Sequence, residues 1–187
     1  MRNDETKGPL GRIVDGISSM FVAKPKEVFF VKFIDSSGNF ELLYPKGWVF
    51  DHDIAIVDAR YTISFCSPDS QSTFTIAVDA NLPSDFKFKE YAKRELEGPC
   101  SGIYTKAERG GFKGMPAYLR DFTYRSGGRA YFGGGVMFCS GDVVFSISYN
   151  APESRRAEME AIFCHMKERF QVRQGFVMTD RRKKITS

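Results

Sequence analysis

The stretch AYLRDFTYRSGGRAYFGGGVMFCSGDVVFSISY, residues 117–149, decides the fold class. Aromatic and apolar residues alternate with polar or small ones along much of it, which is the two-residue period of a β-strand. Two turn signals, at 126–128 and 140–142, divide it into three runs of strand length. Strands joined by such short turns run antiparallel. The sequence therefore predicts antiparallel strands over 117–124, 129–139 and 143–149.

The rest of the chain adds more strands and two helices. On the N-terminal side, strand patterns occupy residues 28–34, 40–44, 61–65, 74–78 and 103–108. A helical period occupies 86–97, where Ser84 is a candidate cap, and a second one occupies 152–170, where Pro152 suits the first turn. Gln171 onward is expected to be a loose, basic end. We therefore expect an α+β fold, an α-β-α sandwich around a mainly antiparallel sheet, in a single domain.

The length of 187 residues fits one domain with tails. We expect an N-terminal extension over 1–24, a domain over 25–172 and a basic C-terminal tail over 173–187. Within the extension, residues 10–21 place Leu10, Ile13, Val14, Ile17 and Phe21 on one face of a short helix. Such a helix is either packed on the domain or used for a partner or a membrane surface.

Charge is unevenly distributed along the chain. Residues 173–187 hold five basic residues and one acidic residue, while residues 1–172 hold 22 of each. A neutral body argues against a specific nucleic-acid partner, although a local basic patch would not show in composition. The cluster Arg181, Arg182, Lys183 and Lys184 is either a solubilising tail or a weak, salt-sensitive contact for an anionic surface.

The N-terminus has no apolar stretch of signal-peptide type, and no run approaches 18 apolar residues. We therefore expect a cytoplasmic protein without a transmembrane segment. The four cysteines are scattered and are expected to be reduced thiols.

Three short sequence patterns are candidate chemical sites. Asp51-His52-Asp53 carries metal-ligand atoms, but an extended segment points the imidazole away from the two carboxylates. Gly133-Gly134-Gly135 is not followed by Lys-Ser/Thr and lies in a strand pattern, where glycine marks a bulge or a close backbone approach. His52 and His165, the two histidines, are linked to no nucleophile motif. We expect no catalytic residue, no metal and no cofactor.

Two local motifs carry a family resemblance. One is FELLYPKGW, residues 40–48, a strand that ends in an aromatic-Pro-x-Gly-Trp turn; the other is GGFKGMPAYLRDFTY, residues 110–124, a glycine turn leading into an aromatic strand. In their order and spacing they resemble the PsbP-like superfamily, which includes the PsbP proteins of photosystem II, the DcrB-like lipoproteins and a Ran-binding nucleotide-release factor. The resemblance covers roughly residues 38–172. It implies an α-β-α sandwich and a non-enzymatic accessory or protein-binding role, with the partner unknown.

Two alternative functions assign different roles to Trp48. With Tyr44 it either lines a pocket for a small ligand or substrate, or it seals one end of the core while Gly47 supplies a turn. The first arrangement would favour a ligand-binding protein or an enzyme, and the second a protein-binding domain.

Overall fold

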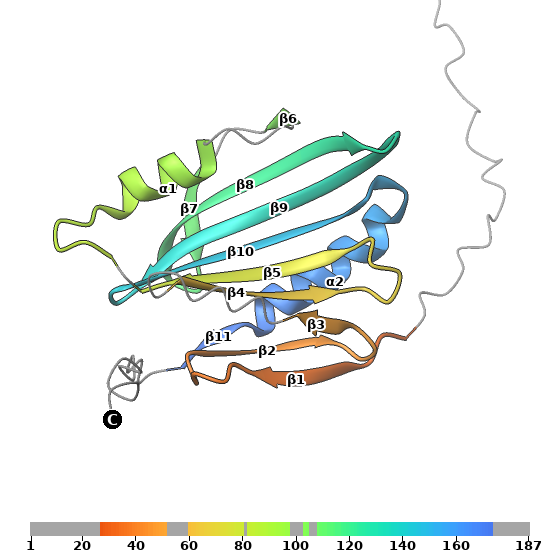
Figure 1. Cartoon of the computed structure of the whole chain (residues 1–187), viewed down its shortest axis with the longest axis horizontal. Helices are drawn as coiled ribbons and strands as arrows, with labels where there is room; N and C mark the ends of the chain where they lie inside the picture. The colour runs from red at the N-terminus through yellow and green to blue at the C-terminus, as the bar shows by residue number, and fades with distance from the viewer. Residues whose placement is uncertain (1–26, 52–59, 81, 98–102, 105–107, 174–187) are drawn as a thin grey trace, which may run out of the picture.

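The computed structural model describes residues 27–51, 60–80, 82–97, 103–104 and 108–173, and the structural statements below concern these residues (Figure 1). The strands are β1 (Phe30–Ile34), β2 (Phe40–Pro45), β3 (Val49–Asp51), β4 (Arg60–Cys66), β5 (Thr73–Asp79), β6 (Ile103–Tyr104), β7 (Glu108–Phe112), β8 (Met115–Ser126), β9 (Arg129–Ser140), β10 (Val143–Pro152) and β11 (Gln171–Val172). The helices are α1 (Phe88–Glu97), α2 (Arg156–Arg169) and a 3-10 turn before α2, η1 (Glu153–Arg155).

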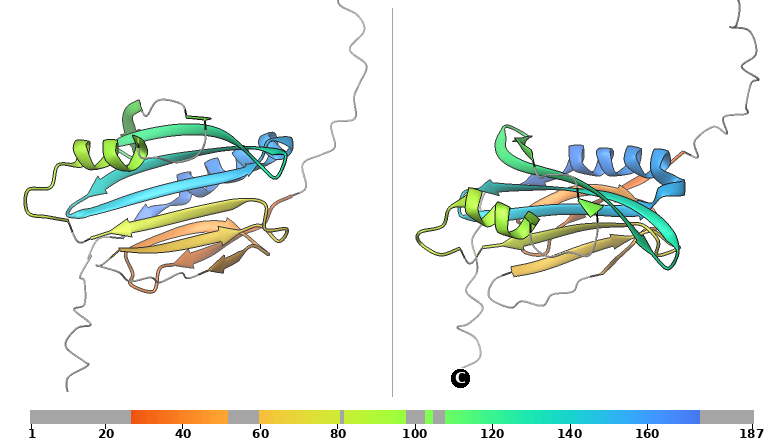
Figure 2. Two further views of the ribbon diagram at one scale, coloured as in Figure 1. Left: turned by 45° about the horizontal axis from the view of Figure 1, so that its top comes forward. Right: turned by 90° about the horizontal axis from the view of Figure 1, so that it is seen from above.

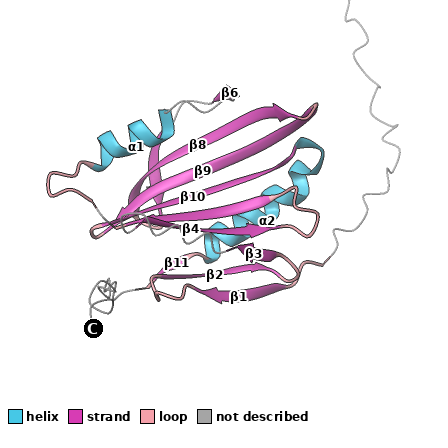
Figure 3. Ribbon diagram, viewed as in Figure 1, coloured by secondary structure: helices cyan, strands magenta, loops and turns pink. Residues whose placement is uncertain are grey.

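The strands form two antiparallel sheets (Figure 3). The larger sheet has eight strands in the order β3-β4-β5-β10-β9-β8-β6, with β7 also paired to β8. The smaller has the order β1-β2-β11. The three long strands confirm the interpretation of residues 117–149, and Gly127 and Gly128 both have the positive φ that a two-residue hairpin turn requires.

The layers match the predicted sandwich. α2 and the smaller sheet pack on one face of the large sheet, and α1 lies against the other face, as the view from above shows (Figure 2). Alternation along β4 and β5 turns Ile63, Phe65, Phe74 and Ile76 toward α2 and the smaller sheet. The same alternation leaves small polar residues such as Thr75 on the opposite face.

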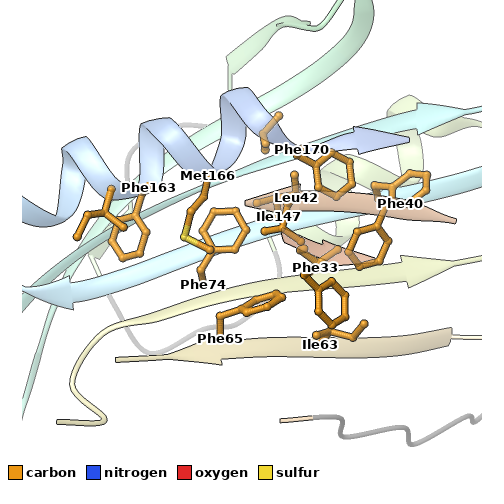
Figure 4. Close-up of a cluster of buried hydrophobic side chains, with 14 of the residues drawn as sticks. Phe33, Phe40, Leu42, Ile63, Phe65, Phe74, Ile147, Phe163, Met166 and Phe170 are labelled. Atoms are coloured by element: carbon orange, nitrogen blue, oxygen red, sulfur yellow. The ribbon is translucent and has the colours of Figure 1, made fainter. Parts of the chain in front are cut away.

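Phenylalanine dominates the core between these layers (Figure 4). Eight of the twelve largest fully buried side chains are phenylalanines. Phe170, which follows α2, stacks on Phe40 of β2 with ring centroids 5.3 Å apart, and Phe138 stacks on Phe145 at the same separation. Because aromatic pairs gain energy beyond their buried area, these contacts join the helix and both sheets into one core.

Three details differ from the sequence prediction. Residues 108–112 form strand β7, and the turn lies later, at Lys113 and Gly114, which both have positive φ. The final helix begins at Arg156, because residues 153–155 form a 3-10 turn after Pro152. Residues 171–172 are not a loose end: they pair with β2, which places them in the small sheet.

The glycine triplet 133–135 lies inside β9 with regular pairing on both sides. The Phe122 ring and the backbone oxygen of Tyr149 approach Gly133 so closely that a side chain at this position would collide with them. The expected close approach is therefore confirmed, and the triplet does not form a loop before a helix.

Cys66, Cys139 and Cys164 are free thiols, and Cys100 lies outside the described residues. Among the described helices, none is long and apolar enough to cross a membrane. The predicted helix at 10–21 and the basic cluster Arg181 to Lys184 also lie outside the described residues.

Candidate functional site: a groove beside Trp48

A groove of about 480 Å³ opens at one end of the molecule. Four segments far apart in sequence meet there: residues 27–29 before β1, the turn after β2, the β4–β5 turn, and the start of α2. Figure 1 shows these segments together at the end where β1 begins and α2 starts. The antiparallel topology brings them together, because β1 begins where β2 ends.

A tight turn places Trp48 in this groove. The Trp48 amide donates to the carbonyl of Pro45 at 3.1 Å, and Gly47 has φ of +92°, which is the pattern of a type II turn with glycine in its third position. The indole then packs edge-on against Phe163 of α2, with ring centroids 6.3 Å apart. Trp48 is only 9% exposed, so it forms a wall of the groove and part of the core at once.

The groove has an apolar floor and an apolar rim. Met159 and Ile162 of α2 are buried beneath it, while Phe29 is 64% exposed and Val28 is 38% exposed. The Phe29 backbone is held in place, because its carbonyl accepts a hydrogen bond from the Lys46 amide at 2.7 Å. A fixed backbone thus presents an exposed aromatic ring at the mouth of an apolar groove.

Three of the five charged residues that line the groove are paired with one another. Arg155 donates to Asp69 at 2.9 Å and to both carboxylate oxygens of Glu158 at 3.0 and 2.9 Å. The hydrogen bond from the Ser67 hydroxyl lowers the pKa of Asp69, and the Gln71 amide and the Arg155 charge act in the same direction. The carboxylate of Asp69 is therefore held ionised, which suits an ion pair and not proton transfer at neutral pH.

A second groove, of about 380 Å³, lies between α2 and the strands β7, β8, β9 and β10. Tyr149 lies across it, with the ammonium of Lys167 4.8 Å from the centre of its ring. Burial, together with the nearby charge of Asp121, raises the pKa of Tyr149 to about 12, so the phenol is neutral at physiological pH. A Cβ atom at position 134 would lie about 2.5 Å from the Tyr149 hydroxyl. Because Gly134 has no side chain, the Tyr149 ring has room to lie over this position.

The predicted site residues are distributed as follows. Trp48 lines the first groove, but Tyr44 does not: its ring packs against Phe65, with centroids 5.0 Å apart. The His165 ring packs against the Phe30 ring, with ring centroids 4.2 Å apart. His52 lies outside the described residues. Across the part of the chain that the structure describes, no three His, Cys, Asp or Glu side chains are grouped for a metal ion.

Sequence reasoning missed Phe29, Val28 and the pair Arg155–Asp69. The apolar run Val28-Phe29-Phe30 held a signal, because three consecutive apolar residues in an extended segment place at least one on the solvent side. The Arg155–Asp69 pair spans 86 residues and left no local pattern.

Comparison with known proteins identifies the fold. No protein-family profile and no curated protein sequence matches the chain. Among solved structures, the cyanobacterial PsbP (CyanoP) of Synechocystis sp. PCC 6803 is similar with a TM-score of 0.59 and 16% identity, covering 89% of this chain and 100% of that one. LpqN, involved in cell envelope biogenesis of Mycobacterium tuberculosis, has a TM-score of 0.52 and 10% identity, covering 78% and 91%.

A structure from Bacteroides thetaiotaomicron VPI-5482 also has a TM-score of 0.52, with 18% identity, covering 76% of this chain and 48% of that one. The likeness at these identities is one of fold. The chain has the PsbP-like fold that its two sequence motifs predict.

Proposed function

We propose that this chain is a non-catalytic binding domain that takes up apolar side chains of a protein partner in the groove beside Trp48. The observation that carries the proposal is Phe29, an aromatic ring 64% exposed on a backbone held by a hydrogen bond from Lys46. Exposed apolar residues that cluster beside a hollow are typical of interaction sites.

Energetics favour a partner at this position. Covering a phenylalanine side chain that would otherwise face water stabilises a complex by roughly 1.5–3 kcal/mol. Because the Phe29 backbone is already ordered, binding loses little further conformational entropy there. An aromatic anchor beside an apolar hollow, surrounded by polar groups, has the composition of a binding hot spot.

The fold supports the same proposal. The resemblance to the PsbP-like superfamily implies an accessory or binding role, and the solved structures with this fold include a PsbP protein and an envelope-biogenesis protein. The groove adds a place for the partner, which fold likeness alone does not supply.

A second candidate function uses the same groove for a small ligand or substrate. Its volume, about 480 Å³, lies within the range of small-molecule sites, which is roughly 300–1,000 Å³. Such sites also need polar groups that point at the ligand, whereas Arg155, Asp69 and Glu158 are directed at one another. We therefore rank the small-ligand function second.

The test is affinity capture from native lysate with the wild type, Phe29→Ser and a matched control, Val49→Ser. Val49 is equally exposed, at 66%, but lies on β3 and does not line the groove. We expect Phe29→Ser to lose the captured protein while Val49→Ser retains it. Retention by both variants would exclude the groove as the docking site. A small molecule released from the wild type and absent from Phe29→Ser, seen by native mass spectrometry, would favour the second candidate.

The basic tail is a separate proposal. We propose that Arg181, Arg182, Lys183 and Lys184 contribute a weak electrostatic contact to an anionic surface. Deleting residues 179–187 should then reduce capture at low salt and leave it unchanged at high salt, because exposed charges are screened beyond about 8 Å at physiological ionic strength. Capture by the deletion variant that equals capture by the wild type at both salt concentrations would contradict this contact.

A further inference from the structure

We infer that residues 10–21 of this same chain dock in the Trp48 groove and compete there with the partner. The inference rests on the proposed function, because it assigns a regulator to the same groove. Four observations support it: where the chain meets the groove, the apolar pattern of the segment, the chemistry of the groove walls, and the charges of both.

The first observation is the place at which the N-terminal part of the chain reaches the domain. Glu27, Val28 and Phe29 themselves line the groove, so the chain before them arrives at its rim. Six residue steps separate Phe21 from Glu27. Fully extended, they span at most about 20 Å. The segment is therefore tethered within reach of the groove.

The second observation is the spacing of apolar residues in the segment. Leu10, Ile13, Val14, Ile17 and Phe21 recur at intervals of three and four, and Arg12, Asp15 and Ser19 fall on the opposite side of a helix. A helix of 12 residues is marginal in water, so it needs a surface that covers its apolar face. The groove offers such a surface through the exposed Val28 and Phe29 at its rim, above the largely buried Trp48.

The third and fourth observations concern size and charge. With about 480 Å³, the groove accepts a few large apolar side chains and not a whole helix, so the segment would lie over it and insert part of its apolar face.

The charged residues lining the groove are Glu27, Asp69 and Glu158 against Lys46 and Arg155, an excess of one acid. Residues 1–26 carry five basic and three acidic residues. Residues 10–21 hold one of each, Arg12 and Asp15, so the docking segment itself is neutral and the excess of two basic charges lies in the residues on either side of it. These flanking charges favour bringing the segment to a groove that has an excess of one acid.

Because residues 10–21 are joined to the domain, a weak contact is enough to keep them in the groove. A connection of only a few residues holds the segment at an effective concentration on the order of millimolar. A partner must displace the segment, so its apparent affinity falls by the fraction of molecules whose groove is occupied. The segment thus sets a threshold for partner binding without any change in the folded domain.

Photo-crosslinking in the full-length chain tests the docking directly. A p-benzoylphenylalanine in place of Ile17 should crosslink within the same molecule to residues 27–29, 45–48, 67–69 or 155–162, mapped by mass spectrometry. The same group in place of Ser19, on the opposite side of the helix, should crosslink there at least several-fold less. Both positions lie outside the described core, so the domain fold is not at risk.

Other results would overturn the inference. Crosslinks from position 17 that are absent, that map elsewhere, or that are no more frequent than those from position 19 would exclude docking in the groove. Crosslinks that appear only in a band of twice the mass, and that vanish on dilution, would mean that a second copy supplies the segment.

Two substitutions then test the competition. Ile17→Asp should raise partner capture, while Ser19→Asp, which adds the same charge on the polar side, should leave it unchanged. Equal capture by both variants would contradict competition. Failure of the crosslinks while Phe29→Ser still abolishes capture would reject only the docking segment. Successful crosslinks with capture unaffected by Phe29→Ser would instead reject the partner site.

Discussion

The two grooves beside α2 are similar in size but differ in what occupies them. The groove between α2, β8 and β9 contains Tyr149, which lies under Lys167 and beside Asp121. The Trp48 groove is lined by the largely buried Trp48, and its rim exposes Phe29 and Val28. Both grooves expose apolar side chains, Leu119 at 40% in the first and Phe29 at 64% in the second, but only Phe29 is an exposed aromatic ring, whereas the Tyr149 ring of the first groove already has the Lys167 ammonium over its face.

This difference separates a structural hollow from a candidate binding site. Tyr149 gains ring contacts and a cation above its face, so filling that groove with a ligand would disturb contacts that already stabilise the domain. At Trp48 a partner would cover the exposed side chains of Phe29 and Val28, and it would displace water and the tethered residues 10–21 from them. Volume alone would not have distinguished the two grooves.

The largest expected effect comes from removing the wall of the Trp48 groove. Trp48→Ala should lower the free energy of unfolding by about 3–5 kcal/mol, because the indole is 9% exposed and packs on Phe163. The measurement is chemical denaturation, with Val49→Ala as control, which should stay within about 0.5 kcal/mol of wild type. A Trp48→Ala variant with wild-type stability would show that the indole belongs to the groove and not to the core.

The second prediction concerns the filled groove. Gly134→Ala should cost about 1–3 kcal/mol, because the new methyl group would meet the Tyr149 hydroxyl and the Asp121 carboxylate at about 2.5 and 2.7 Å. Gly111→Ala is the matched control in strand β7, where the new methyl group would lie 3.8 Å from the backbone oxygen of Met115, an ordinary contact distance. Equal losses for the two variants, measured by denaturation, would mean that Tyr149 is not held in place by Gly134.

A third prediction follows from the raised pKa of Tyr149. The phenol is neutral in both folded and unfolded chains below pH 10, and between pH 10 and about 12 the unfolded chain ionises first. Stability is therefore fully present below pH 10 and falls as pH rises toward 12. Tyr149→Phe should show a shallower fall than wild type in denaturation curves over this range. An unchanged slope would contradict the burial of the phenol.

The smallest effect is expected at the charged rim of the Trp48 groove. Arg155→Ala should cost no more than about 1 kcal/mol, since its ion pairs with Asp69 and Glu158 are partly exposed. Thermal unfolding at low and high salt measures this, and the loss should shrink as salt rises. A loss of several kcal/mol, independent of salt, would show that Arg155 supports the groove floor and not only its rim.

Much of the fold was predictable, because it follows from local period and turn chemistry. The alternation of Phe74, Ile76 and Val78 fixes which face of β5 is buried, and the Gly127-Gly128 turn fixes the β8–β9 hairpin. The motif at residues 40–48 also predicted the turn that places Trp48. These signals lie within a few residues of the structure that they specify.

The groove was only partly predictable, because it depends on long-range packing. The sequence left two alternatives for Trp48, a pocket wall or a seal at the end of the core, because its contact with Phe163 joins residues 115 positions apart. The ion pair of Arg155 with Asp69 likewise joins residues 86 positions apart. Tyr44, which the pocket alternative grouped with Trp48, does not line this groove, since its ring packs against Phe65. The two-residue strand β11 is too short to show a period, so its place beside β2 was also missed.

The most direct test of the central claim compares the two grooves in the same protein. A photo-crosslinker replaces Phe29 in the Trp48 groove or Leu119, which is 40% exposed, in the Tyr149 groove, and each full-length variant is irradiated in native lysate. If the Trp48 groove is the binding surface, a partner protein is crosslinked from position 29 and not from position 119. Crosslinks to the same partner from position 119 alone, or equally from both positions, would contradict it.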